Sequence, residues 1–66
     1  MKIYINDSVV EASDGATLSE VIEANGIEPR GIATAINGVV VKGSDRESHK
    51  LSDGDKILII KAFYGG

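Results

Sequence analysis

The chain has 66 residues, enough for one small domain, and it contains no cysteine. It therefore has no disulfide, no cysteine-ligated metal centre and no thiol nucleophile. Seven basic and ten acidic residues give a net charge of −3, and without a Lys/Arg cluster the chain does not resemble a nucleic-acid binder. The longest apolar run, Ile57 to Ile60, is too short for a membrane span and no signal peptide is visible, so we expect a cytoplasmic protein.

The first residues predict a β-hairpin. Lys2 to Asn6 alternates polar and apolar side chains, with Ile3 and Ile5 on one face, which is the spacing of a strand. The turn-forming residues Asn6 to Ser8 follow. We expect Val9 to Ala12 to be the returning strand.

A short helix is predicted next. The segment T-L-S-E from Thr17 to Glu20 has the sequence of a capping box, in which two side chains bond to each other's backbone N–H groups. Leu18, Val21 and Ile22 form one apolar stripe at helical spacing. Gly26 suits the left-handed residue that follows a helix, which predicts a helix of roughly two to three turns.

The second half of the chain predicts three further strands. Ile32 to Asn37 alternates large and small side chains, and Asn37-Gly38 followed by three valines is typical of a hairpin with a type I′ turn. Gly43 to Lys50 is polar and is expected to be a loop or a short irregular element. Lys56 to Ala62 is the last strand and the most apolar one.

The polar residues of the second half offer no recognisable catalytic group. His49 is the only histidine and lies in a polar loop, as does the segment Asp45 to Glu47, and we interpret both as solvated. Asp53 and Asp55 flank Gly54, but the long calcium-binding loop closed by a bidentate Glu is missing, so a turn is the better interpretation. Without a nucleophile–base pair or a nucleotide-binding glycine motif, we do not expect an enzyme.

The element order predicts the fold class. One amphipathic helix among five strands implies an α+β fold, in which the helix packs on one face of a sheet of four to five strands. A ubiquitin-like fold would make this a mixed sheet. Strand, strand, helix, strand, strand is the order of the ubiquitin-like β-grasp. In ubiquitin-like proteins the first and last strands pair in parallel, a pairing that the sequence pattern alone does not show. We expect a β-grasp domain over residues 1–62 and a flexible C-terminal tail over residues 63–66.

The last strand is apolar on both faces. Ile57 and Ile59 share one face, whereas Leu58, Ile60 and Ala62 share the other. Because one helix covers only one face of a sheet, we expect the second apolar face to be exposed and to be a partner site. Tyr4, on the outer face of the first strand, is expected to extend this surface.

The end of the chain is the remaining candidate for chemistry. Gly65 and Gly66 follow the aromatic pair Phe63 and Tyr64. A terminal carboxylate is ionised at neutral pH and is a poor electrophile, so it needs activation, for example as an acyl adenylate. Glycines let the backbone enter a narrow channel, and four extended residues reach about 13 Å. We therefore expect Gly66 to carry the reactive carboxylate, with Phe63 and Tyr64 as aromatic anchors at the channel entrance.

Five segments together resemble the ThiS-type sulfur carriers of thiamine biosynthesis, within a ubiquitin-like group that includes the small subunit of molybdopterin synthase. They are M-K-I-Y-I-N at 1–6, T-L-S-E-V-I at 17–22, A-I-N-G-V-V-V at 35–41, L-S-D-G-D-K-I-L-I-I at 51–60 and the terminal G-G. The resemblance covers the whole chain. Molybdopterin-type carriers tend to be longer and to have prolines before the terminal glycines, so the thiamine branch is favoured.

This resemblance implies a function and a set of partners. A ThiF-type adenylating enzyme would use ATP to activate the Gly66 carboxylate, sulfur from a persulfide would replace AMP, and the thiocarboxylate would serve a ThiG-type thiazole synthase. The carrier itself would bind no cofactor and catalyse nothing, and we expect it to be a monomer when free. The resemblance places Ile57 and Ile59 against the helix and assigns the chemistry to Gly65 and Gly66. The residues implied in docking are Leu58, Ile60, Ala62, Phe63 and Tyr64.

Three other functions stay open at this point. A molybdopterin-type carrier would share the chemistry and differ in the acceptor of the sulfur. A ubiquitin-like modifier would use the same adenylate but would be joined to lysine side chains. A non-catalytic β-grasp interaction module would be indifferent to deletion of Gly65 and Gly66.

Overall fold

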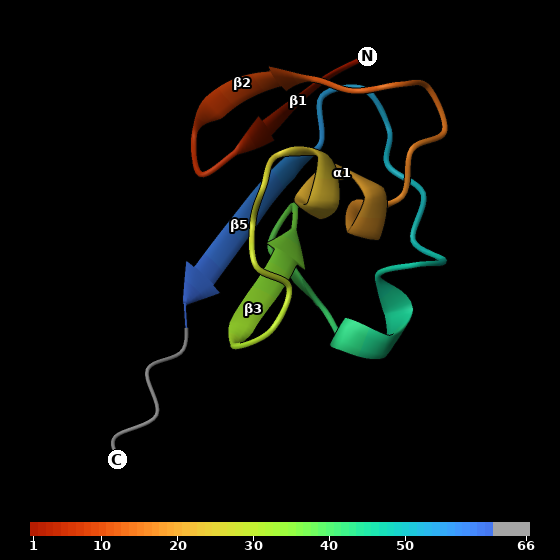
Figure 1. Ribbon diagram of the computed structural model, residues 1–66. Helices are drawn as coiled ribbons and strands as arrows, with labels where there is room; N and C mark the ends of the chain where they lie inside the picture. Colours follow the sequence, from red (N-terminus) through yellow and green to blue (C-terminus); the bar gives the residue numbers. More distant parts are fainter. Residues whose placement is uncertain (62–66) are drawn as a thin grey trace.

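The computed structural model describes residues 1–61, and residues 62–66 lie outside its described part. The described chain forms one five-stranded sheet with a single α-helix against it (Figure 1). The elements are β1 (Lys2–Ile5), β2 (Ser8–Glu11), α1 (Leu18–Ala24), β3 (Ile32–Ile36), β4 (Val39–Val41), a short 3-10 helix (Gly43–Asp45) and β5 (Lys56–Lys61). The predicted element order is therefore confirmed, and β2 begins one residue earlier than expected.

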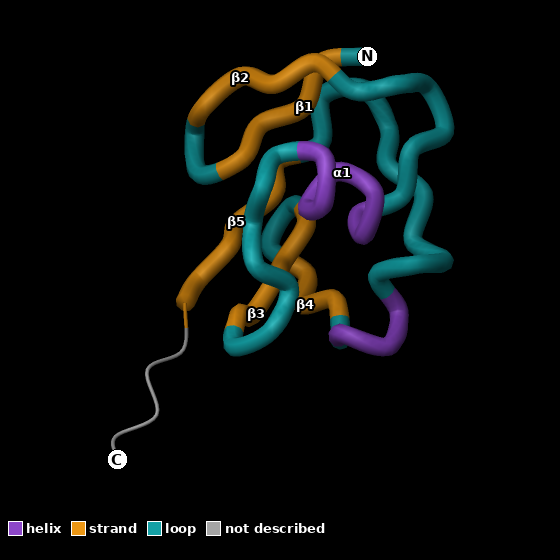
Figure 2. The backbone as a smooth tube through the Cα atoms, viewed as in Figure 1, coloured by secondary structure: helices purple, strands orange, loops and turns teal. Residues whose placement is uncertain are grey.

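The strand order in the sheet is β2-β1-β5-β3-β4, so β5 lies at the centre (Figure 2). Only the β1–β5 pair is parallel, with Tyr4 opposite Lys56 and Ile5 opposite Ile57. The other three pairs are antiparallel. The predicted mixed sheet and the central parallel pair of the β-grasp fold are both confirmed.

The core lies between α1 and the inner face of the sheet. Leu18, Val21 and Ile22 form the predicted apolar stripe of the helix, and all three are buried. They pack in one cluster with sheet and loop residues that are also buried, namely Ile3, Ile36, Val41, Leu51 and Ile57. Burying this apolar surface is the main favourable term in the stability of so small a domain.

The helix begins and ends at the predicted residues. The Oγ1 of Thr17 accepts from the Glu20 N–H at 3.2 Å, and the Thr17 N–H donates to Glu20 Oε1 at 3.0 Å, which completes the capping box. Asn25 caps the C-terminal end, and Gly26 follows with a φ of 68°. Such a left-handed residue after a helix favours glycine.

Both β-hairpins close with two-residue turns in the left-handed region. Asn37 and Gly38 have φ values of 50° and 82°, as the type I′ prediction requires. Asn6 and Asp7 have φ values of 47° and 70°, so the first hairpin uses the same kind of turn. The sequence indicated a turn there without specifying its type.

Arg46 corrects one interpretation of the sequence. Asp45 and Glu47 are exposed, as expected of a solvated loop, but Arg46 is half-buried. Its guanidinium donates hydrogen bonds that tie the loop to the start of β3: to Thr34 Oγ1 at 3.1 Å, to the Ile32 carbonyl at 2.9 Å and to the Pro29 carbonyl at 3.0 Å. The solvated interpretation of Arg46 is wrong because these acceptors are brought to the loop by the tertiary fold.

Candidate functional site

The two faces of β5 have opposite environments. On the inner face Ile57 is 3% exposed, and Ile59 packs against the core. On the outer face Leu58 is 49% exposed and Ile60 is 55% exposed. The expectation that one apolar face of this strand is left uncovered by the helix is confirmed for the described residues.

The outer face of the sheet forms an apolar patch across three strands, and we call Val40, Leu58 and Ile60 the outer patch. Ala35 lies opposite both Leu58 and Val40, and Ala33 lies opposite Ile60. The alanine side chains are small, so they leave the larger side chains of the outer patch uncovered. Val40, 74% exposed, was missed from the sequence because its membership depends on the β3–β4 register.

Tyr4 lies beside the outer patch. It is half-buried, and it lines one shallow groove together with Leu58 and Lys56. Because Tyr4 is opposite Lys56 in the parallel β1–β5 pair, its side chain shares the outer face. The prediction that Tyr4 extends the apolar surface of β5 is consistent with this placement.

The last described residue, Lys61, lies at the end of the central strand. Ile32 of β3 pairs with it on one side. On the other side, the side chain of Asn6 is bonded to the backbone of Ile59. The remaining residues predicted for the site all follow this point and lie outside the described residues: Ala62, Phe63, Tyr64, Gly65 and Gly66.

The polar residues away from β5 serve the fold. Asp53 accepts from the Lys2 N–H at 2.8 Å, and Asp55 accepts from the Ser52 N–H at 2.8 Å and from Asn37 Nδ2 at 3.0 Å, which confirms the predicted turn. His49 is half-buried, and its carbonyl accepts from the Leu18 N–H. Among residues 1–61, no three His, Asp or Glu side chains gather as metal ligands would.

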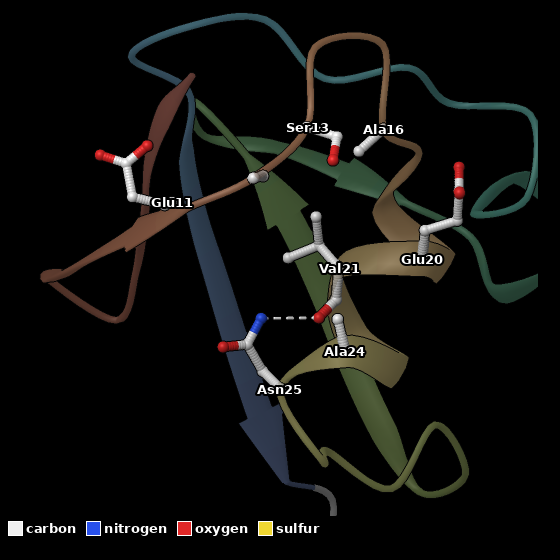
Figure 3. A pocket seen from close by; sticks show the side chains of 8 residues that line it. Glu11, Ser13, Ala16, Glu20, Val21, Ala24 and Asn25 are labelled. Carbon is white, nitrogen blue, oxygen red and sulfur yellow. Dashed lines mark hydrogen bonds between the residues drawn. The ribbon is translucent and has the colours of Figure 1, made fainter.

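A groove of about 280 Å³ separates β2 from α1 (Figure 3). Two of its polar side chains are already engaged: Glu20 belongs to the capping box, and Asn25 Nδ2 donates to the Val21 carbonyl at 2.8 Å. The lining also includes the carboxylate of Glu11 and the hydroxyl of Ser13, with Ala16, Val21 and Ala24 on the helix side. Among residues 1–61 no hydrogen bond joins the Ser13 hydroxyl to a carboxylate, so the groove is not a candidate catalytic site.

In the described part of the chain, no helix has the length and the apolar character needed to cross a membrane.

Because the groove between β2 and α1 is not a catalytic candidate, the candidate site is a surface rather than a cavity. It consists of the outer patch and of the strand end that leads into residues 62–66.

Comparisons with known proteins agree with this architecture. The family model described as the ThiS family matches residues 2–66. The sulfur carrier protein ThiS of Escherichia coli is 33% identical over 66 residues, which cover all of both chains. Among solved structures, the thiamine biosynthesis protein ThiS of Geobacter metallireducens aligns with a TM-score of 0.81 at 20% identity, covering 100% of this chain and 99% of that one.

A ubiquitin-like protein of the archaeon Caldiarchaeum subterraneum aligns with a TM-score of 0.50 at 23% identity, over 97% of this chain and 96% of that one. The two structural alignments support the ubiquitin-like β-grasp fold, and the family match supports a carrier protein rather than an enzyme. The chain belongs to the ThiS family of sulfur carrier proteins.

Proposed function

We propose that this protein carries sulfur as a thiocarboxylate on Gly66 and delivers it to the synthesis of the thiamine thiazole. The observation that carries the proposal is the match to the ThiS family over residues 2–66, which includes both terminal glycines. The Escherichia coli relative is named a sulfur carrier protein, and the Geobacter relative is named a thiamine biosynthesis protein.

The chemistry begins with the carboxylate of Gly66. A ThiF-type enzyme transfers AMP from ATP to this carboxylate and releases pyrophosphate, which turns a poor electrophile into a good one. The terminal sulfur of a persulfide then attacks the acyl carbon and expels AMP. Reductive cleavage of the S–S bond by a thiol leaves the thiocarboxylate, the sulfur donor for a ThiG-type thiazole synthase.

The carrier's own contribution is recognition and reach. In the proposal the outer patch docks on the partner enzymes, because exposed apolar side chains on the outer face of a sheet gain free energy when a partner covers them. Residues 62–66 then extend from β5 into the partner's active site, with Phe63 and Tyr64 at its entrance. Gly65 and Gly66 have no side chain to obstruct a narrow channel.

The cofactor and the compartment follow from the same proposal. ATP is bound by the activating enzyme and not by the carrier. Both partner enzymes and the carrier would act in the cytoplasm, with the carrier free as a monomer between encounters.

Activation tests the proposal. Wild type, Gly66→Ala and a variant without Gly65 and Gly66 are incubated with a ThiF-type enzyme and ATP, and pyrophosphate release is measured. We expect release with wild type, a sharp reduction with Gly66→Ala and none with the truncated chain. Equal rates for all three would refute the proposal and leave the passive β-grasp module.

A further inference from the structure

The end of β5 has different neighbours on its two sides. β3 pairs with it as far as Lys61, which lies opposite Ile32. On the other side β1 ends at Ile5, opposite Ile57, and the last backbone bond runs from the Asn6 N–H to the Ile57 carbonyl at 2.9 Å. β5 therefore continues past the end of its parallel neighbour, just before residues 62–66.

Beyond the end of β1, the side chain of Asn6 bonds to β5 as a neighbouring strand would. Its Oδ1 accepts from the Ile59 N–H at 2.8 Å, and its Nδ2 donates to the Ile59 carbonyl at 3.1 Å. A neighbouring strand offers its partner the same pair of groups, one acceptor and one donor. Ile59 is thereby held in the sheet at the point where β1 no longer reaches.

We propose that Asn6 is a positioning residue for the C-terminal tail, because its amide holds β5 in the sheet two residues before the last described residue, Lys61. The inference rests on the proposed function. If β5 opened at Ile59, the strand end up to Lys61 would no longer be held in the sheet, and Ile60 would leave the outer patch. A strand end that is held less firmly spreads the Gly66 carboxylate over a larger volume and lowers its effective concentration in a docked partner's active site.

The other hairpin supplies a matched control. Asn37, like Asn6, is the first residue of a two-residue turn and has a positive φ, 50° against 47°. Its Oδ1 also accepts from a backbone N–H of β5, that of Lys56 at 3.0 Å. Lys56 is the first residue of β5, at the end opposite to the tail. Glycine tolerates positive φ, so Asn6→Gly and Asn37→Gly each remove the side-chain bonds and retain the turn.

Two measurements on wild type, Asn6→Gly and Asn37→Gly test the inference. Amide hydrogen exchange, followed by NMR, reports on the Ile59 N–H. We expect this exchange to be about tenfold faster in Asn6→Gly, which corresponds to about 1.4 kcal/mol, and unchanged in Asn37→Gly. In the activation assay, we expect kcat/KM to fall by at most about twofold for Asn6→Gly, because freeing Ile60 and Lys61 adds only two residues to the segment that carries Gly66, and to be unchanged for Asn37→Gly.

The control variant Asn37→Gly distinguishes a positioning role of Asn6 from a purely structural one. If both variants lose the same free energy of unfolding and the same kcat/KM, Asn6 only stabilises the domain and the positioning role is overturned. Unchanged exchange of the Ile59 N–H in Asn6→Gly overturns it as well. A wild-type chain that is not activated refutes the proposed function and the positioning role with it, whereas a failure confined to Asn6→Gly refutes the positioning role alone.

Discussion

Replacement of Arg46 by Met should destabilise the domain more than any other single change at a charged residue of the 43–50 loop. The methionine keeps an apolar stem of similar length but removes all three guanidinium hydrogen bonds. The bonds to Thr34 and Ile32 are partly buried, whereas the bond to Pro29 is exposed. With about 1 kcal/mol for each partly buried bond and little for the exposed one, the loss is about 2 kcal/mol.

Urea denaturation measures this loss. For a domain of this size the slope of the unfolding free energy is about 1 kcal/mol per molar urea, so the midpoint should fall by about 2 M. Arg46→Lys replaces the guanidinium with a single ammonium group, so its urea midpoint should lie between those of wild type and Arg46→Met. The control is Arg30→Met, since the Arg30 side chain is 92% exposed and pairs only with exposed Glu28. Equal midpoints for Arg46→Met and Arg30→Met would refute the reasoning.

Two further predictions concern β5 and the 28–30 loop. Ile57→Ala should lower the free energy of unfolding by about 3 kcal/mol, whereas Ile60→Ala, at a half-exposed site, should cost less than about 1 kcal/mol in urea denaturation and instead raise KM for the activating enzyme. An unchanged KM in Ile60→Ala would remove Ile60 from the docking surface. The Glu28 carboxylate accepts hydrogen bonds from the Arg30 backbone N–H and from the Arg30 side chain. These two bonds, the backbone one having the larger effect, lower the pKa of Glu28 from its ordinary value of 4.5. Because the folded pKa is lowered, this bonding stabilises the fold above the unfolded pKa, and the effect is lost as pH falls through the folded pKa. An NMR titration of Glu28 giving 4.5 or more would contradict this.

Local patterns in the sequence predicted most of the fold. The capping box at Thr17, the apolar stripe from Leu18 to Ile22 and the turn at Asn37-Gly38 each depend on residues a few positions apart. Short-range spacing fixes such features because they follow from helix and hairpin geometry alone. The alternation in β5 predicted two apolar faces, and the resemblance to the sulfur carriers assigned Leu58 and Ile60 to the exposed one.

The contacts that the sequence did not predict join residues that are far apart in the chain. Asn6 meets Ile59 across 53 positions, and Arg46 meets Thr34 across 12. Both residues have a plausible local interpretation, Asn6 as a turn residue and Arg46 as a solvated loop residue. Only the register of the sheet brings each of them to its backbone or side-chain partner. The same holds for Val40, whose place in the outer patch depends on its pairing with Ala35.

The identity of the terminal atom on Gly66 tests the central claim most directly. The carrier is incubated with ATP, a ThiF-type enzyme and a persulfide source, and its intact mass is measured accurately with fragmentation. Fragmentation is needed because oxidation of Met1 adds nearly the same nominal mass. The account predicts that one carboxylate oxygen is replaced by sulfur at Gly66. An unchanged Gly66, with an enzyme that is active on another carrier, would contradict it.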